Sequence, residues 1–301
     1  SGDIPGSVIK IIYRQPMNAV GSARLGIMGV GFFARNVVRG SDDCEVDVMC
    51  PEGDSWQCER DAVVRLRITQ SGGIYYCSGS MVNNTDLDCR QLLLTAFHCA
   101  DAVDEDEWAY LKVRYNYEYL ECGGTTSINS HTRTGVIMLS NSDDATNQGF
   151  SGSDFLLVEV EDAIPVTWNP FYAGFDASGE TGHSGVGIHH PAGDRKKIST
   201  YTNPLTSYSL GSAGSHWRVF WEATETNHGV TEGGSSGSPI FSENHQIVGT
   251  LSSGLSACLV GGAGNGTGPD QPDFYGKMSY HWDGSNPIPS SQQLNNFLDP
   301  S

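Results

Sequence analysis

The chain has 301 residues, long enough for one large domain or two modest ones with a substantial core. Its 17 basic residues stand against 35 acidic ones, a formal net charge of −18, and its longest basic run is the segment 195–197. This composition argues against nucleic acid as a partner, because phosphate binding needs a concentrated positive face. The charge instead indicates a solvated acidic surface outside the cell, which also attracts cationic substrates.

The first 43 residues differ from the rest, being apolar, rich in glycine and free of cysteine. We interpret 1–43 as an N-terminal extension or propeptide remnant and 44–301 as the folded domain. The longest apolar run, at 27–33, is interrupted by glycine and is far shorter than the ~20 residues that span a bilayer. No membrane association is expected, and a secreted precursor would already have lost its signal peptide.

Alternation of apolar and charged residues with a period of two recurs after the extension. Val64, Leu66 and Ile68 alternate with arginines, and a second alternating run extends from Leu111 to Tyr117. Because 37 glycines and 13 prolines punctuate such runs, the sequence predicts many short antiparallel strands in a barrel or sandwich.

Only the C-terminus has a helical pattern. Ser290 and Gln293 have capping-box spacing before the apolar residues Leu294, Phe297 and Leu298, and a proline follows at 300. The sequence therefore predicts one short C-terminal helix.

Eight cysteines are scattered along the chain without a CxxC pair. An even number at scattered positions indicates disulfides and an oxidising compartment, and it argues against a zinc site.

Two separate segments carry the residue types that acyl transfer requires. His98 precedes Cys99, and Ser236 lies in the glycine-rich segment TEGGSSGSP. A serine becomes a good nucleophile when a neighbouring base takes its proton, and the developing oxyanion needs backbone N–H donors about 3 Å away. Because Gly234 and Gly237 allow a tight turn, we expect the N–H groups of Gly234 and Ser236 to form this oxyanion hole.

A third group, a buried carboxylate, must orient the histidine and stabilise its charged form. Asp154 meets an apolar run in GSDFLLVEV, whereas the acids at 104–107 and 143–144 lie in polar clusters. The sequence therefore predicts a catalytic triad of His98, Asp154 and Ser236 that cuts peptide bonds.

The order His, Asp, Ser within TA-x-HC, SDF-x-L and G-x-SG-x-P resembles the chymotrypsin-like serine proteases, and among them the bacterial lysyl endopeptidases. The shared strings are CEVDVMCPEGD at 44–54, CSGSMVNNT at 77–85, LLTAFHC at 93–99, RYNYEYLEC at 114–122, SDFLLVEV at 153–160, NPFYAGFD at 169–176, IHHPAGDRKKIS at 188–199, GVTEGGSSGSPIFS at 229–242, PDFYGKM at 272–278 and the final FLDP.

This resemblance implies an all-β fold of two antiparallel six-stranded β-barrels, with the triad in the cleft between them. It implies a secreted bacterial endopeptidase that cleaves polypeptides after Lys or Arg through an acyl-enzyme on Ser236. We expect the enzyme to be a monomer that uses no cofactor and no metal ion. It also implies three disulfides, Cys44 to Cys258, Cys50 to Cys122 and Cys77 to Cys99. Cys58 and Cys89 match no bridge of the family, and we expect them to form a fourth disulfide, with two free thiols as the alternative.

The resemblance also identifies candidate substrate-binding residues. Asp273, in PDFYGKM, matches the acid at the floor of the family's specificity pocket, where a carboxylate selects a basic side chain. Ser252, Ser253 and Gly254 match the strand that pairs with the substrate backbone. The family has a histidine in place of Ser252, and some members have a tryptophan near Tyr208. These two departures leave the choice between Lys and Arg open.

The boundary between the N-terminal extension and the folded domain suggests that the chain is a zymogen, a precursor activated by a cut at this boundary. Mature enzymes of the family begin at a glycine shortly before the first cysteine, as Gly40 does here. If the enzyme itself cuts between Arg39 and Gly40, its pocket must accept arginine. The alternative is that residues 1–39 stay attached as an arm.

His189 and His190 are adjacent, and neighbours on a strand point to opposite faces, so we expect structural roles and no metal site. Acidic loops could bind calcium, but no ligand spacing identifies one. Asn-x-Thr sequons occur at 83–85, which includes Asn84, and at 265–267, which begins at Asn265, and a bacterial source leaves both unmodified.

Two other functions fit parts of the sequence. A glutamyl endopeptidase has a similar nucleophile segment, although Asp273 would repel an acidic side chain. An inactive, protease-like binding protein is the second alternative, although such proteins usually lose a member of the triad.

Overall fold

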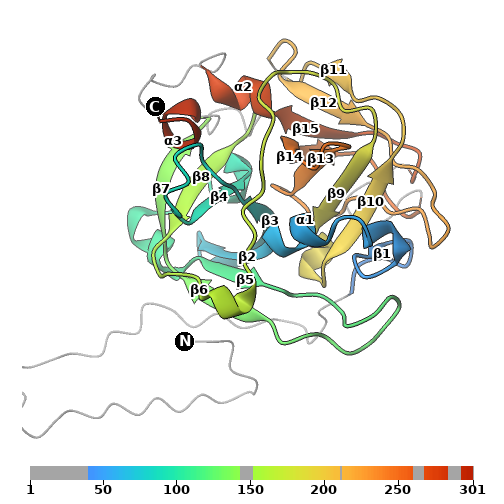
Figure 1. Cartoon of the computed structure of the whole chain (residues 1–301), viewed down its shortest axis with the longest axis horizontal. Coiled ribbons are helices and arrows are strands. Elements are labelled where there is room, and N and C mark those ends of the chain that lie inside the picture. The colour runs from blue at the N-terminus through green and yellow to red at the C-terminus, as the bar shows by residue number, and fades with distance from the viewer. Residues whose placement is uncertain (1–39, 143–151, 211, 260–267, 284–292, 301) are drawn as a thin grey trace, which may run out of the picture. The chain divides into compact units, whose positions relative to one another are not determined.

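The computed structural model describes residues 40–142, 152–210, 212–259, 268–283 and 293–300. Most of the predicted extension, residues 1–39, lies outside the described residues. Within the described part, two antiparallel β-sheets lie side by side (Figure 1), so the predicted all-β, two-sheet fold is confirmed. No helix in this part is long and apolar enough to cross a membrane.

The first sheet has seven strands in the order β6-β5-β2-β3-β4-β8-β7. Its edge strands β6 and β7 are consecutive in the chain and separated only by Gly135, so the sheet curves until its two edges meet end to end. The strands are β2 (Val63–Gln70), β3 (Gly73–Met81), β4 (Leu92–Thr95), β5 (Lys112–Tyr115), β6 (His131–Thr134), β7 (Val136–Asn141) and β8 (Leu156–Val160).

The second sheet has eight strands in the order β1-β10-β9-β13-β14-β15-β12-β11. The strands are β1 (Val46–Asp47), β9 (Gly185–His189), β10 (Lys197–Tyr201), β11 (Thr206–Tyr208), β12 (His216–Val219), β13 (Pro239–Ser242), β14 (Ile247–Gly254) and β15 (Asp273–Lys277). The second sheet exceeds the six strands expected, because β1, of two residues, and β11, of three, pair at its edges. The first sheet exceeds that number by one, because the run 131–141 is divided at Gly135 into β6 and β7.

The helices are short. They are α1 (Gln57–Ala62), α2 (Met278–Trp282) and α3 (Asn295–Leu298). The C-terminal helix was predicted, although its expected capping residue Ser290 lies outside the described residues. The other two were missed, because helices of five and six residues are too short for a periodic pattern.

Three-residue and six-residue 3₁₀ turns join several of the strands. They are η1 (Pro51–Gly53), η2 (Phe97–Cys99), η3 (Glu105–Tyr110), η5 (Val166–Trp168) and η6 (Pro191–Gly193).

Both predicted alternating runs are strands, β2 and β5, and their apolar residues are buried. One charged residue that the alternation placed in solvent, Arg65, is buried as well. Arg65 is 6% exposed, stacks on Tyr76 and Tyr117, and donates a 2.7 Å hydrogen bond to the Gly193 carbonyl. Contacts between the two sheets, which local periodicity does not encode, therefore account for this exception.

Three disulfides are present, and they are the three that were predicted: Cys44–Cys258, Cys50–Cys122 and Cys77–Cys99. The expected fourth disulfide is wrong, because Cys58 and Cys89 are free and exposed. Cys58 lies on α1, while Cys89 lies beside Tyr172 in the loop before β4. Asn169, three positions before Tyr172, donates a hydrogen bond to Asp61 of α1.

A buried ion pair joins the residue just before β10 to the loop after β5. The Lys196 ammonium lies 2.8 Å from the Glu118 carboxylate, and both side chains are almost fully buried. Arg60 approaches the same carboxylate at 3.4 Å. Breaking such a pair is costly because it leaves a buried charge without its partner.

We predict that Lys196→Met lowers the free energy of unfolding by about 3 kcal/mol in urea denaturation, because it removes the nearer of the two basic groups that contact the buried Glu118 carboxylate. The double variant Lys196→Met/Glu118→Gln should recover most of this loss. The matched control is Arg90→Met, which breaks a partly exposed pair with Glu159 and should cost no more than about 1 kcal/mol. Equal losses for the two single variants would contradict the prediction.

Candidate active site

The predicted acid and base are in direct contact. The Asp154 carboxylate lies 2.6 Å from Nδ1 of His98 and also accepts a 2.9 Å hydrogen bond from the His98 backbone N–H. His98 lies in η2, directly after β4, and Asp154 directly precedes β8, the strand that pairs with β4. Strand pairing therefore brings together two residues that are 56 positions apart.

Asp154 is fully buried and has a positive φ of 59°. This left-handed conformation is rare for residues other than glycine, and Asn and Asp tolerate it best. A third donor fixes the carboxylate, because the Ser252 hydroxyl donates to it at 2.7 Å. Ser252 thus contacts the acid, whereas the sequence placed it only among residues that bind substrate.

Opposing effects act on the imidazole of His98. Burial lowers its pKa, but the charge and hydrogen bond of Asp154, together with the charge of Asp101, raise it more. The net pKa of His98 is above its ordinary value of 6.5. The imidazole is therefore stabilised in its protonated form, as a base that must hold a proton during a reaction requires.

The loop that carries Ser236 packs against the segment that carries His98. The Ser236 carbonyl accepts a 2.8 Å hydrogen bond from the Ser78 N–H and lies 3.7 Å from the sulfur of Cys99. Gly237 has a φ of 78°, and a Cβ there would lie 2.6 Å from the Ala96 nitrogen. Only glycine fits at this position, so the loop reaches the backbone just before His98.

The N–H groups of Gly234 and Ser236, the predicted oxyanion-hole donors, are oriented by hydrogen bonds to the carbonyls of the same peptide groups. The Gly233 carbonyl accepts from Ala192 N–H at 2.7 Å, and the Ser235 carbonyl accepts from Ser238 N–H at 3.0 Å. Because C=O and N–H point in opposite directions across a trans peptide, the N–H groups of Gly234 and Ser236 face away from these anchors. Neither N–H donates a hydrogen bond within the described part of the chain.

Ser78 was missed by the sequence analysis, and it links both halves of the site. Its hydroxyl donates to the Gly234 carbonyl and accepts from the His190 N–H, each at 2.9 Å. It is fully buried on β3. No local motif marks this serine, because its role depends on contacts more than 100 positions away.

Asp273, the predicted pocket acid, is fully buried at the start of β15. Five donors surround its carboxylate. One oxygen accepts from the backbone N–H groups of Leu255 and Ser256, and the other from Trp221 Nε1 and the hydroxyls of Thr231 and Ser256 at 2.6–2.7 Å. Burial raises the pKa of Asp273 above its ordinary value, although these donors oppose the shift. The sequence identified the acid but none of its partners.

The other predicted substrate-binding residues flank Asp273. Gly254 pairs with Asp273 across β14 and β15, and a Cβ at Gly254 would lie 2.2 Å from the carboxylate. Ser253 pairs with Phe274. Tyr208 lies on the edge strand β11, where its ring packs on Phe274 with centroids 4.5 Å apart. The structure thus places all three residues around one end of β15.

The adjacent histidines have structural partners, as predicted. His189 contacts the hydroxyls of Ser235 and Ser199 at 2.7 and 3.1 Å, and His190 contacts the Asp194 carbonyl at 2.9 Å. Burial, followed by the charge of a nearby lysine, lowers the pKa of His189 to about 3 and that of His190 well below its ordinary value. Both rings are therefore neutral at physiological pH.

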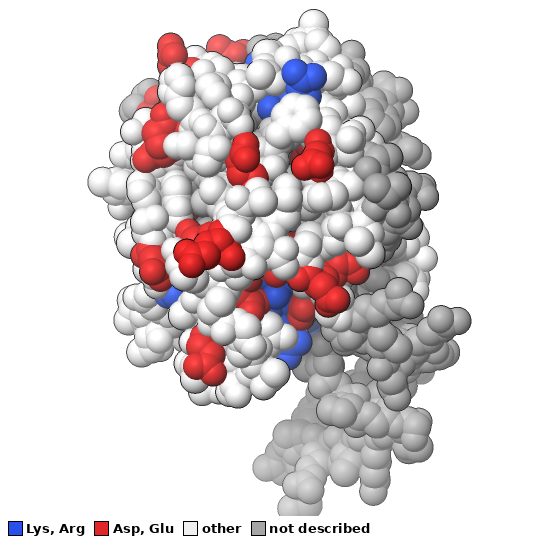
Figure 2. Space-filling view, turned by 90° about the vertical axis from the view of Figure 1, so that its right-hand side faces the viewer, with Lys and Arg blue, Asp and Glu red and all other residues white. Residues whose placement is uncertain are grey.

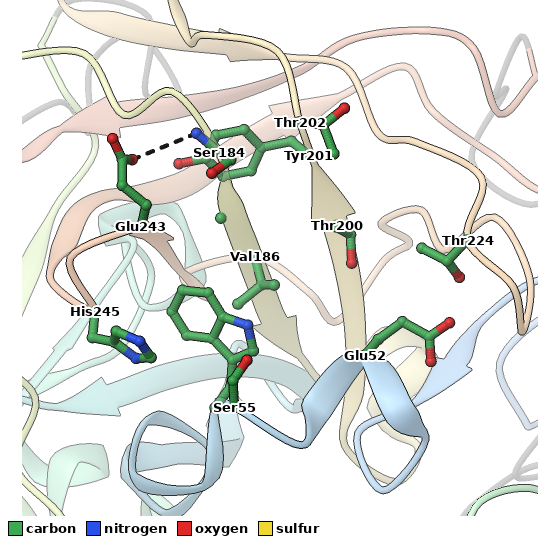
Figure 3. Close-up of a pocket in the computed structure, with 12 residues that line it drawn as sticks. Glu52, Ser55, Ser184, Val186, Thr200, Tyr201, Thr202, Thr224, Glu243 and His245 are labelled. Carbon is green, nitrogen blue, oxygen red and sulfur yellow. Dashed lines mark hydrogen bonds between the residues drawn. The ribbon is translucent and has the colours of Figure 1, made fainter.

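A separate cavity of about 440 Å³ opens beside β9 and β10 (Figure 3). Glu243 and Glu52 lie on opposite sides of it, with Val186 and Thr200 between them. It includes none of the candidate catalytic residues. The side of the molecule shown in Figure 2 carries many more acidic than basic side chains, in agreement with the net charge of −18.

The arrangement of the sheets is the chymotrypsin-like serine protease fold. A thermostable serine protease from an extremophilic microorganism is similar in structure, with a TM-score of 0.50 and 14% identity over 73% of this chain and 93% of that chain.

The sequence comparison is more specific. The family described as lysyl endopeptidase, C-terminal domain, matches residues 38–276, so the chain belongs to that family of serine proteases. A lysyl endopeptidase of Pseudomonas aeruginosa is 29% identical over 277 residues, which make up 85% of this chain. The chain spans about half, 56%, of the length of that curated relative. The resemblance predicted from the sequence is thereby confirmed.

We predict that Asp101→Asn lowers the pKa of the His98 imidazole, because it removes one of the charges that favour the protonated ring. An NMR titration of the His98 ring measures this directly. Asp106→Asn, another exposed acid nearby, should leave the pKa unchanged. An unchanged pKa in Asp101→Asn would show that the charge of Asp101 does not act on the His98 imidazole.

Proposed function

We propose that the chain is a secreted serine endopeptidase that cleaves polypeptides after basic residues, with Lys preferred over Arg, through an acyl-enzyme on Ser236. The main support is the 2.6 Å contact between His98 and the buried Asp154, next to the loop that carries Ser236. No cofactor is needed for this chemistry, because base, acid and nucleophile are side chains of the chain itself.

In the proposed reaction, Nε2 of His98 takes the Ser236 hydroxyl proton as the oxygen attacks the scissile carbonyl carbon. Asp154 holds the Nδ1 proton and stabilises the imidazolium. The N–H groups of Gly234 and Ser236 donate to the oxyanion. His98 then gives its proton to the leaving amine, and water releases the acyl group by the same steps.

The specificity for a basic residue follows from the charge of Asp273. A carboxylate has about four lone-pair sites, and here five donors already occupy both oxygens. A planar guanidinium needs two acceptors along one edge, whereas a compact ammonium binds as a point charge and can also donate to the hydroxyls of Thr231 and Ser256. The crowded carboxylate therefore favours Lys.

Three further expectations accompany this proposal. The three disulfides agree with an oxidising, extracellular location. A monomer without nucleic-acid or membrane partners remains our prediction. The two alternatives for residues 1–39, removal by a cut between Arg39 and Gly40 or retention as an arm, both remain. Residues 40–43, which the sequence assigned to the extension, contact the domain through hydrogen bonds from Ser41 to Asp194 and from Asp42 to Glu232.

The two alternatives are less well supported. A glutamyl endopeptidase would have to bind an acidic side chain beside the Asp273 carboxylate. An inactive binding protein would have no reason to keep His98 and Asp154 in contact beside Ser236.

Ser236→Ala should abolish turnover of a lysine-containing peptide, because no other group would form the acyl-enzyme. The parent chain should be labelled on Ser236 by a phosphonate or sulfonyl fluoride, while the variant should not. Turnover retained in the variant would contradict the mechanism, and absence of labelling in the parent would favour the inactive binding protein.

A matched set of peptides with Lys, Arg, Glu or Leu before the scissile bond tests the specificity. We expect kcat/KM to be highest for Lys, about tenfold above Arg, and negligible for Glu and Leu. Asp273→Asn should lower kcat/KM for the Lys peptide by about 100-fold or more, while labelling of Ser236 by small reagents persists. Dominant Glu cleavage, or unchanged Lys selectivity in the variant, would remove Asp273 from the pocket.

A further inference from the structure

One fully buried histidine, His281, lies beside the segment that carries Asp154, the acid of the proposed triad. It is on α2, the short helix that directly follows β15. Nδ1 of His281 lies 2.7 Å from the Ser153 hydroxyl, and Nε2 lies 3.1 Å from the Thr250 hydroxyl. Ser153 immediately precedes Asp154. Thr250 lies two positions before Ser252, whose hydroxyl donates to the Asp154 carboxylate. The imidazole therefore bridges the two chain segments that meet at this carboxylate.

The same ring contacts the residue on the other side of Asp154. The rings of His281 and Phe155 are tilted, with centroids 4.9 Å apart, and Phe155 is fully buried. The Phe155 N–H donates a 3.1 Å hydrogen bond to the Ser142 hydroxyl, which fixes this residue from the first sheet. A change in the backbone angles of Asp154 would move Ser153 or Phe155 away from the imidazole. One side chain thus contacts both neighbours of the acid.

The backbone of β15 packs closely against this arrangement at Gly276. A Cβ at Gly276 would lie 1.9 Å from the Ser153 carbonyl oxygen and 2.8 Å from Cε1 of His281. Only glycine fits so close to both groups. Gly276 pairs with Thr250 across β14 and β15. The second sheet therefore holds Ser153 in place where the chain enters β8 of the first sheet.

Asp154 needs such support because its φ is 59°. A residue with a Cβ is disfavoured in this left-handed region, so the surrounding structure must hold it there. Relaxation to a negative φ would redirect the carboxylate. His98 and Ser252 contact that carboxylate at 2.6 and 2.7 Å, and both contacts depend on its direction.

We propose that His281 is a positioning residue for the triad acid. It holds Ser153 and Phe155 on either side of Asp154 and connects them to Thr250, so that the carboxylate stays aligned with Nδ1 of His98. This inference rests on the proposed function, because it assigns His281 a part in the same reaction. His281 acts through Asp154 and not through contact with the reacting atoms.

A neutral imidazole suits this part. Burial, and then the charge of His216, lower the pKa of His281 well below its ordinary value. A neutral ring has one donor and one acceptor nitrogen, while each hydroxyl can donate or accept. Both hydrogen bonds can therefore form in either tautomer. The bridge adds no charge beside the Asp154 carboxylate, so the imidazolium of His98 does not compete with a second cation.

A purely structural role, in which His281 only packs α2 against the sheet, is the competing explanation. In that case, loss of the imidazole lowers the stability of the chain and leaves the His98–Asp154 pair as it is. Contact with both neighbours of Asp154 favours positioning instead, and the two explanations predict different behaviour of His98.

Two substitutions separate the two hydrogen bonds of His281. The amide of His281→Asn reaches the place of Nδ1 and can keep the hydrogen bond to Ser153. The amide of His281→Gln reaches the place of Nε2 and can keep the one to Thr250. Both variants remove the ring from Phe155, so each is a matched control for the loss of packing in the other.

His281→Gln should lower kcat for a lysine-containing peptide about tenfold, with KM unchanged within about twofold, because the triad is misaligned while the pocket is intact. His281→Asn should keep kcat within about threefold of the parent chain. Equal losses of kcat in the two variants, or losses of Tm without any loss of kcat, would overturn the proposal.

An NMR titration in the full chain carrying Ser236→Ala measures the pKa of the His98 imidazole without turnover. His281→Gln should lower this pKa by about 0.5 or more, because a redirected Asp154 carboxylate favours the imidazolium less. His281→Asn should keep the parent value. An unchanged pKa in His281→Gln would overturn the positioning role. The expected change of pKa in a parent chain that has no turnover would support the positioning role and overturn only the proposed protease activity.

Ser153→Ala tests the same link without altering the histidine. It should reproduce the decreases in kcat and in the His98 pKa that we expect for His281→Gln. The double variant Ser153→Ala/His281→Gln should be no worse than either single variant, because both changes remove one interaction. Losses that multiply in the double variant would show that the two residues act separately and would overturn the proposal.

Discussion

The candidate site depends on the way one buried serine holds two sheets together. Ser78, on β3, donates its N–H to the Ser236 carbonyl and its hydroxyl to the Gly234 carbonyl, while it accepts from the His190 N–H. The loop of the second sheet is therefore bound to the first sheet just where β4 leads into His98. These hydrogen bonds hold the loop of Ser236 against the sheet that carries the His98–Asp154 pair.

Two buried aspartates in the site have different surroundings. Asp154 contacts His98, which gains a proton in the proposed reaction. The positive charge of the imidazolium then balances the negative charge of Asp154. Asp273 contacts only neutral N–H and O–H donors, so its charge is dispersed but not balanced. This difference supports our proposal that Asp273 lies in the specificity pocket and Asp154 in the triad.

The sequence identified those candidate site residues that lie in short, recognisable motifs. His98, Asp154 and Asp273 could each be selected from a short string, and the structure buries both acids and places His98 against Asp154. Ser78 and Thr231 could not be selected, because a serine or threonine acquires such a role only through distant partners. Helices α1 and α2 were missed because five or six residues do not establish a period. The free thiols of Cys58 and Cys89 show that an even number of cysteines does not determine their pairing.

The left-handed backbone of Asp154 has an evolutionary consequence. A single base change converts an aspartate codon into one for asparagine, glycine, alanine, valine, histidine, tyrosine or glutamate. Asparagine and glycine adopt a φ near 59° most readily, and both lack the carboxylate. Glutamate keeps the charge but places it one methylene farther out on a strained backbone. A single base change at this codon therefore yields either a residue that adopts the backbone conformation but lacks the carboxylate, or a residue that strains the backbone. No such change preserves both the carboxylate and the unstrained backbone.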